Sequence, residues 1–377
     1  MTILTALLVL LLLGALVYSL IAMFAVRSYL RARPHAEHTP TEPISILKPL
    51  SGLDHGLESN LRTFFEQQYP AFEILFAVRT PEDPAVEVVN KLRQEYPNIP
   101  TRLIVTGEPP YPNAKVFSLQ RMVELAANDL VVMSDSDIRV SPSLLATVAA
   151  EFRDSKTGVA TCPYRAVPGG SIWSKLEATG MNTDFMSGIL VARMLEGMQF
   201  AVGPTIAARR RVLEAIGGFE RLKDYLAEDF VMGKFAAEAG HGVLLSSYVI
   251  EHHIGSSDFE NNAAHRLRWA RSTRRSRPLG YLGQVFTMPL PLAMFLAIVE
   301  PSLWAAVPSA FLVRAVAAHM VSERVLQAKL NWLLLPFEDL AGFCFWVAGF
   351  FGNTIVWRGR RYKLYADGRF KLITEQA

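Results

Sequence analysis

The chain has 377 residues, of which 51% are hydrophobic and 19% are charged, and its mean hydropathy is positive at +0.21. This composition excludes a disordered chain, a coiled coil and a collagen-like fibre. The 38 basic and 35 acidic side chains give a net charge of +3, which is too small to indicate a nucleic-acid-binding protein. The two cysteines, Cys162 and Cys344, are too few for a disulfide framework or a zinc site, and we expect reduced thiols.

The N-terminal segment has the composition of a membrane helix. The run from Ile3 to Val26 has no charged side chain and is long enough to cross a bilayer. A signal peptide is the alternative, but it would carry a basic segment before the apolar run. Here Arg27, Arg31 and Arg33 follow the run instead. We therefore predict a transmembrane anchor over residues 1–27, with the following segment in the cytoplasm.

Residues 42–280 have the pattern of a globular α/β domain, in which short apolar runs alternate with helical patterns. The predicted buried strands are Ile44–Leu47, Phe72–Val78, Arg102–Val105 and Leu130–Met133. The predicted helices are Leu57–Tyr69, Pro84–Tyr96, Asn113–Ala127 and one that begins at Ser141-Pro142. This alternation predicts a mostly parallel sheet with helices on both faces, which binds ligands beyond the carboxyl ends of its strands.

Residues 281–357 contain three apolar runs, which are Val285–Val299, Ser302–Val313 and Leu340–Val356. The first two contain prolines and are short for spans, so transmembrane, re-entrant and interfacial helices all fit them. The charged segment Ser322–Asp339 between the last two predicts an amphipathic stretch on the cytoplasmic membrane surface. Residues 358–377 form a predicted basic tail, whose charges favour a cytoplasmic end, whereas three full spans would place it outside.

Two pairs of acidic residues stand in apolar surroundings. Asp135 and Asp137 directly follow the predicted strand Leu130–Met133, where carboxylates are costly unless a cation compensates them. Their oxygen atoms suit Mg²⁺ or Mn²⁺, although a capped turn is the alternative. Glu228 and Asp229 form the second pair, for which a solvated helix start is the alternative.

A basic stretch and a methionine-rich segment complete the candidate features. Residues 266–277 are rich in arginine, which fits either a helix on an anionic membrane surface or, at Arg268, a diphosphate contact. The apolar segment 171–199 contains several methionines, which suit an irregular apolar ligand. We predict that this segment contacts the membrane or a lipid, with plain core packing as the alternative.

In this order and spacing, six short segments resemble the ceramide glucosyltransferases, including the bacterial branch that glycosylates hopanoids. The segments are Leu47–Gly52, Asn60–Glu66, Glu82–Ala85, Asp135–Val140, Tyr225–Asp229 and Arg268-Trp269. The resemblance covers nearly the whole chain. It implies a membrane-anchored, inverting glycosyltransferase with a GT-A fold that uses a divalent cation, Mg²⁺ or Mn²⁺.

The resemblance also implies roles for the acidic residues. Asp83 is expected near the uracil and ribose of a UDP-sugar. Asp135 and Asp137 are expected at the metal and the diphosphate. Asp229 is the expected general base, and Glu228 beside it is included in the catalytic pair.

The same resemblance assigns the basic and aromatic residues to the nucleotide-sugar site. Lys115 matches a family lysine near the nucleotide, although Ala114 stands where the family often has proline. His265, Arg268 and Trp269 match the last motif, in which the family has Gln or Arg at the first position. Histidine at that position favours the hopanoid branch.

The sequence therefore predicts transfer of a sugar from a UDP-sugar to the hydroxyl of a membrane lipid, with UDP-glucose and ceramide as the leading pair. The alternative is UDP-N-acetylglucosamine and a hopanoid polyol. A polysaccharide synthase would need more spans, and a lipid-phosphate acceptor does not fit the Arg-Trp motif. A non-catalytic membrane module would not need the site carboxylates. The expected location is a bacterial inner membrane, with the catalytic domain in the cytoplasm and no nucleic-acid partner.

Overall fold

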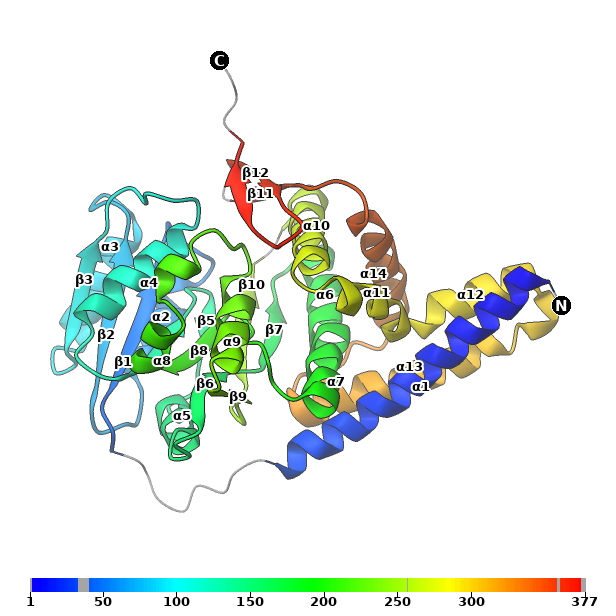
Figure 1. Cartoon of the computed structure of the whole chain (residues 1–377), viewed down its shortest axis with the longest axis horizontal. Coiled ribbons are helices and arrows are strands. Elements are labelled where there is room, and N and C mark those ends of the chain that lie inside the picture. The colour runs from blue at the N-terminus through cyan, green and yellow to red at the C-terminus, as the bar shows by residue number, and fades with distance from the viewer. Residues whose placement is uncertain (1, 33–40, 256, 358–359, 374–377) are drawn as a thin grey trace.

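The computed structural model describes residues 2–32, 41–255, 257–357 and 360–373. Arg33 and residues 358–359 and 374–377 of the predicted basic tail lie outside these ranges. Figure 1 shows the sheet domain at one end of the molecule and the long helices α1, α12 and α13 at the other. The folded chain therefore consists of a globular part and a helical part.

The main sheet has seven strands in the order β3-β2-β1-β4-β8-β6-β9. The strands are β1 (Ile44–Pro49), β2 (Phe72–Val78), β3 (Thr101–Val105), β4 (Leu130–Ser134), β6 (Thr157–Thr161), β8 (Thr205–Arg209) and β9 (Gly242–Leu245). β8 is antiparallel to both β4 and β6, and the other neighbouring pairs are parallel. The predicted mostly parallel sheet is confirmed. The predicted burial of Arg102–Val105 is wrong, because β3 is an edge strand in which Arg102 and Val105 are exposed.

Helices cover both faces of this sheet, because successive strand residues point to opposite sides. Ile44 and Ile46 pack against α2, α3 and α5, whereas Leu47 packs against α4, α8 and α9. The helices are α2 (Leu57–Phe65), α3 (Ala85–Glu95), α4 (Ala114–Leu125), α5 (Leu144–Glu151), α8 (Arg210–Ala215) and α9 (Glu228–Glu238). The predicted start of α5 is too early, because the Ser141 hydroxyl bonds to Ser143 and Tyr248 instead of capping a helix.

A second, three-stranded sheet lies between the main sheet and the long helices. It consists of β5 (Ile138–Arg139), β10 (Ile250–Ile254) and β7 (Tyr164–Pro168), with β10 in the middle. Helix α6 (Ile172–Gly180), a π-helical turn η1 (Met181–Phe185) and α7 (Met186–Glu196) then follow without interruption. This run covers most of the predicted lipid-contacting segment. Helix α10 (Phe259–Ser276) carries the Arg-Trp motif and contacts α6.

Two helical segments are long and apolar enough to cross a membrane. One is α1 (Ile3–Arg31), and the other is Pro301–Val325, which joins η4, α13 (Ala306–His319) and the π-helical turn η5 (Met320–Val325). Between α10 and the second span, Pro278–Thr287 and α12 (Pro289–Val299) form a pair bent by 65°. This bent pair has the form of a broken span or a re-entrant loop.

The predicted amphipathic surface stretch Ser322–Asp339 is wrong at its charged end, whereas Arg324 and Lys329 are exposed and the location of the rest on a membrane surface stays a prediction. The segment runs from η5 into α14 (Leu335–Gly349), and Glu338 and Asp339 at its end are buried. Both acids are buried because each has a buried or partly buried arginine as partner. Arg314 of α13 binds Asp339 through Nε and a terminal nitrogen at 3.0–3.2 Å, and Arg266 of α10 binds Glu338 at 3.0 Å.

The same Arg314 lies 2.6 Å from Asp184 of η1 and 3.1 Å from the Thr183 hydroxyl. We refer to Arg266, Asp184, Arg314, Glu338 and Asp339 as the Arg314 network. It joins the segment that follows α6 to the second span and to α14. A buried ionic network of this kind fixes the relative position of the elements that supply its members.

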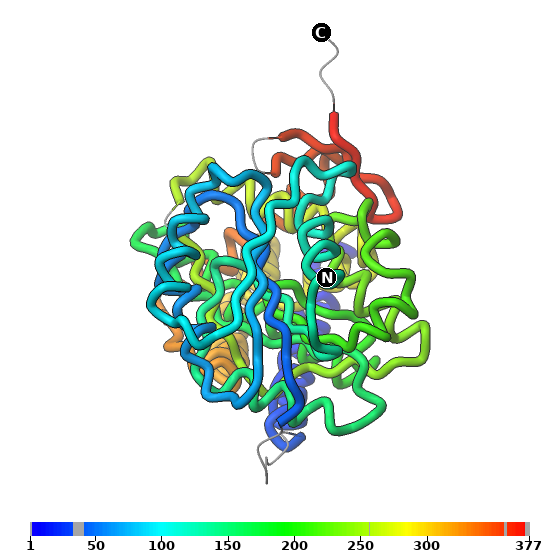
Figure 2. The backbone as a smooth tube through the Cα atoms, turned by 90° about the vertical axis from the view of Figure 1, so that its left-hand side faces the viewer, coloured from blue at the N-terminus to red at the C-terminus, as the bar shows by residue number. Residues whose placement is uncertain are grey.

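The described part of the predicted basic tail is folded. Strands β11 (Thr354–Trp357), β12 (Arg360–Leu364) and β13 (Phe370–Leu372) form an antiparallel sheet, drawn in red at one edge of the molecule in Figure 2. Phe370 packs with Leu226, and its amide donates a hydrogen bond to the Asp224 carbonyl at 2.9 Å. This C-terminal sheet therefore rests on the loop that leads into α9.

Candidate active site

The end of β4 brings three predicted site residues together. Asp135 follows Ser134, the last residue of β4, and its carboxylate lies 2.7 Å from the Lys115 ammonium. Lys115 stands in the first turn of α4 and also lies 3.2 Å from the Glu228 carboxylate. Asn113 caps α4 through the Val116 amide and donates to Glu228 at 3.3 Å. The cap therefore aims Lys115 at both acids.

These pairings leave the charges of the cluster unequally compensated. Burial alone would lower the pKa of Lys115, but Asp135 and Glu228 more than offset this and raise it, so Lys115 is a firm cation. Burial raises the pKa of the Asp135 carboxyl, against the attraction of Lys115. The site thus holds one strong cation between carboxylates, which is an arrangement suited to a phosphate group or a metal ion.

Asp137 is held from the second sheet. The His252 Nε2 atom on β10 lies 3.1 Å from Asp137 Oδ2. Burial opposes ionisation of Asp137, but His252 and then Lys48 outweigh it and lower the pKa to about 2. The other oxygen, Oδ1, is buried and has no hydrogen-bond partner among the described residues.

A divalent cation fits this pair of carboxylates. Asp137 Oδ1 is an unpartnered anionic oxygen, and Asp135 offers a second carboxylate two residues away. Hard oxygen donors are the ligands that Mg²⁺ and Mn²⁺ prefer. Within the described ranges, however, no cluster of three or more histidine, cysteine or acidic side chains has the geometry of a metal centre. Oxygen atoms from a ligand or water would have to complete the coordination.

Asp229 lies in the first turn of α9, close to the backbone of Gly203. A Cβ atom at position 203 would lie 2.5 Å from Asp229 Oδ2, so glycine is required for this approach. Burial and the neighbouring Glu228 raise the pKa of Asp229 to about 7, against the attraction of Lys115. A carboxyl group with a pKa near neutrality is suited to accept a proton from a substrate hydroxyl.

The Asp83 carboxylate binds backbone amides of two separate segments. Its two carboxylate oxygens accept hydrogen bonds from the Gly52 amide at 3.0 and 3.1 Å, and one also accepts from Ala85 at 3.0 Å. It thereby ties the loop after β1 to the start of α3. Its expected contact with uracil and ribose stays a prediction.

The Arg-Trp motif lies on α10 and packs against α6. The His265 Nδ1 atom lies 2.6 Å from the Glu177 carboxylate, and its ring lies 5.4 Å from that of Trp269. Trp269 also packs on Phe185 of η1, at 5.6 Å between ring centroids. Arg268, the diphosphate candidate, makes an interaction within the structure as well. The motif therefore borders the predicted lipid-contacting segment.

A chain of ring contacts links this motif to Asp137. Phe185 packs on Tyr164 at 5.4 Å, and Tyr164 meets the His252 ring edge-on at 5.4 Å. Trp269, Phe185, Tyr164 and His252 thus form a continuous wall that ends at the Asp137 carboxylate. The structure brings Lys115, Asp135, Asp137, Glu228 and Asp229 to one end of this wall, with His265, Arg268 and Trp269 on the helix at the other.

Three residues of this site were not predicted from the sequence, and they are Lys48, Glu177 and His252. Lys48 is fully buried, donates to Ser134 Oγ at 3.3 Å and to the Asp135 carbonyl, and lies over the Phe64 ring. Burial lowers its pKa to about 7, against the attraction of Asp135 and Asp137. The sequence contained a signal for Lys48, because a lysine is unusual inside an otherwise apolar strand. No sequence pattern indicated Glu177 and His252, because their partners, His265 and Asp137, are distant in sequence.

The fold and the site define a glycosyltransferase of the GT-A type. A mannosyltransferase of Pyrobaculum calidifontis, solved in complex with GDP-Man and Mn²⁺, has the same fold, with a TM-score of 0.55 and 16% sequence identity. The match covers 92% of this chain and 97% of that one. A family profile described as "Glycosyl transferase family 21" matches residues 7–370, and the chain belongs to this family.

Curated relatives carry the name ceramide glucosyltransferase. Ceramide glucosyltransferase 1 of Caenorhabditis elegans is 31% identical over 224 residues, which are 59% of this chain and 48% of the relative. Ceramide glucosyltransferase 3 of the same organism is 26% identical over 254 residues, which are 65% and 54% of the two chains. The chain thus spans about half the length of these relatives. The predicted resemblance to the ceramide glucosyltransferases is confirmed.

Proposed function

We propose that the protein transfers glucose from UDP-glucose to the hydroxyl group of ceramide. Family membership supports glycosyl transfer, and the names of the relatives support this donor and acceptor. The observation that carries the proposal is the half-buried Asp229, which has a pKa of about 7 and lies close to the Lys115–Asp135 pair. A single-displacement transfer requires one general base, here Asp229, next to groups that can bind the diphosphate, here Lys115 and its neighbours.

In the proposed reaction, Asp229 accepts the proton of the ceramide hydroxyl while that oxygen attacks the anomeric carbon. The bond from this carbon to the diphosphate breaks in the same step, and UDP leaves. Lys115 and Arg268 carry the charge of the departing diphosphate. Asp135 and Asp137 would hold the divalent cation, which neutralises part of the same charge when bound.

The membrane helices support a lipid acceptor. We propose that residues 42–280 form the catalytic domain and that residues 1–27 and 281–357 hold it at the bilayer. Trp269 and Phe185 stand between the carboxylate cluster and the helices that follow η1. A ceramide hydroxyl at the bilayer surface would reach Asp229 along this side. Arg27 and Arg31 after the first span support a cytoplasmic catalytic domain, where UDP-sugars are found.

Ceramide is preferred to a hopanoid polyol because the relatives described above are named for ceramide. His265, the residue that favoured the hopanoid branch, is bound by Glu177 within the protein. This contact accounts for a histidine at that position without reference to the acceptor.

The test is UDP release by the full-length protein in detergent with Mg²⁺ or Mn²⁺. UDP-glucose and UDP-N-acetylglucosamine are each combined with ceramide and with bacteriohopanetetrol. We expect release that requires UDP-glucose and ceramide together. Release that requires the hopanoid and UDP-N-acetylglucosamine instead would overturn the proposed substrates but leave the catalytic cluster in place.

A further inference from the structure

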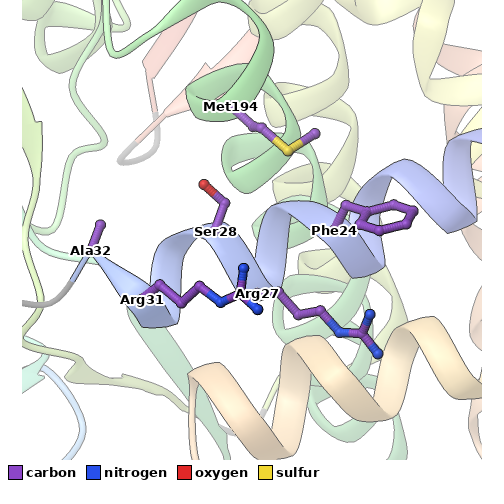
Figure 3. A pocket seen from close by; sticks show the side chains of 6 residues that line it. All are labelled: Phe24, Arg27, Ser28, Arg31, Ala32 and Met194. Carbon is purple, nitrogen blue, oxygen red and sulfur yellow. The ribbon is translucent and has the colours of Figure 1, made fainter.

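A cavity of about 570 Å³ lies at the C-terminal end of α1, the first candidate span. It is lined by Phe24, Arg27, Ser28, Arg31 and Ala32 of the α1 end and by Met194 of α7. Figure 3 shows Met194 across from Ser28, with Arg27 and Arg31 one turn apart on α1 and Phe24 further toward the span. The proposed reaction uses none of these residues, so the cavity needs its own explanation.

The chemistry of the cavity changes along α1. Phe24, three residues before Arg27, has an exposed fraction of 61% and continues the apolar surface of the span. Arg27 and Arg31 are four residues apart, so they share one helix face. Both are exposed, and neither has an ion pair or hydrogen bond within the described ranges. A ligand that fits must therefore be apolar at one end and anionic at the other.

The position of the cavity identifies the source of such a ligand. Val26 and Tyr29 of α1 pack with Val321 and Val325, so the two spans end together. Arg324 at the end of the second span is exposed as well. Ends of spans that carry exposed cations lie at the level of the lipid headgroups.

We propose that this cavity binds the phosphate headgroup of an anionic phospholipid from the surrounding bilayer. Arg27 and Arg31 hold the phosphate by charge-assisted hydrogen bonds, and the Ser28 hydroxyl lies beside it. Phe24 and Met194 contact the upper part of the acyl chains. The site is separate from the donor and acceptor sites and requires only that α1 lies in a membrane.

The test compares short-chain lipids on the full-length protein in detergent, with bound lipid counted by native mass spectrometry. Dioctanoyl phosphatidylglycerol is the anionic probe, and dioctanoyl phosphatidylcholine is the zwitterionic one. Each arginine near a membrane surface contributes about fivefold to anionic lipid binding. We therefore expect the double variant R27Q/R31Q to weaken phosphatidylglycerol binding by roughly twentyfold.

A matched control makes the same charge change elsewhere. Arg93 and Arg211 are exposed on the sheet domain, and R93Q/R211Q should bind phosphatidylglycerol as the unaltered protein does. A third variant, S28F, keeps both arginines but fills the cavity, and we expect it to lose binding as well. The proposal would be overturned if phosphatidylglycerol and phosphatidylcholine bound equally well, or if R27Q/R31Q bound phosphatidylglycerol as the unaltered protein does. It would also be overturned if R93Q/R211Q weakened phosphatidylglycerol binding as much as R27Q/R31Q. Displacement by inorganic phosphate at the same concentration as the lipid would assign the cavity to a free anion instead. UDP release is measured in parallel, and its loss alone would leave the lipid site standing.

Discussion

The buried charges near the ends of β4 and α9 and those of the Arg314 network are paired to different degrees. In the network, Arg314 engages Asp339 through two nitrogen atoms and Asp184 and Thr183 through one. At the site, one ammonium serves both Asp135 and Glu228, and an oxygen of Asp137 has no hydrogen bond to a described residue. Both regions hold buried or half-buried charges with more acids than cations, but the network has two arginines for three carboxylates, whereas the site has two lysines for four.

This difference separates a structural role from a catalytic one. A buried ion pair with its hydrogen bonds complete resists rearrangement and holds elements together. A carboxylate oxygen that has no hydrogen-bond partner keeps an affinity for cations or protons. The comparison therefore predicts that site variants lose activity without unfolding, and that network variants unfold without a specific loss of chemistry.

The largest effect is expected from D229N. Asparagine keeps the shape of the side chain but cannot accept the proton, so kcat should fall by about 10²- to 10⁴-fold. UDP binding, followed by calorimetry, should stay unchanged. E238Q changes an exposed acid on the same helix and should retain full activity. A D229N protein with ordinary turnover would show that Asp229 is not the base.

In the network, D339L should destabilise the protein by about 3 to 5 kcal/mol, because the buried Arg314 loses the carboxylate that binds two of its nitrogen atoms and keeps only Asp184 as a close acid. The midpoint of thermal unfolding in detergent measures this change. The triple variant D339L/R314M/D184N removes Arg314 together with both acids that it binds and should recover most of the lost stability. If D339L unfolds like the unaltered protein but loses activity specifically, the network belongs to the catalytic machinery and the comparison fails.

The smallest expected effect is a shift in the pH dependence of kcat. The raised pKa of Asp229 means that the base is protonated and inactive below about pH 7 and active above it. The rate should therefore rise with pH through about 7. The groups that set this pKa are Glu228 and Asp135, which raise it, and Lys115, which lowers it.

K115M should consequently move the rising limb of the pH profile to higher pH. K234M removes an exposed lysine from α9 and serves as the matched control, with an unchanged profile. A limb that moves to lower pH in K115M, or one that shifts equally in K234M, would contradict the assignment of Asp229 as the titrating base.

Much of the sheet domain could be predicted from sequence because its signals are local. Ile44 and Ile46 alternate with Leu47 in a short apolar run, and that pattern reports a strand buried on both faces. The edge position of β3 could not be predicted in the same way, because it depends on which strand has a second neighbour. The carboxylates at the end of β4 could be predicted as a site because they directly follow a buried apolar strand.

The missed features depend on contacts between distant parts of the chain. Glu338 and Asp339 have the composition of a surface segment, and only their pairing with Arg266 and Arg314 explains their burial. His252 is one of two adjacent histidines, and its link to Asp137 follows from the placement of β10 beside β5. Such partners are set by topology, which a single sequence reports weakly.

The C-terminal sheet has a consequence for the order in which the protein matures. The Tyr225–Leu226 loop, which leads to Asp229, is supported by Phe370 and by a bridge from Tyr225 to Arg369. Arg271 and Arg274 of the motif helix donate to carbonyls of Phe351 and Gly352, just before that sheet, and of Thr354, its first residue. A ribosome makes these supports after both membrane spans. The loop that leads to Asp229 therefore gains its support from the C-terminal sheet only after both candidate spans have been made.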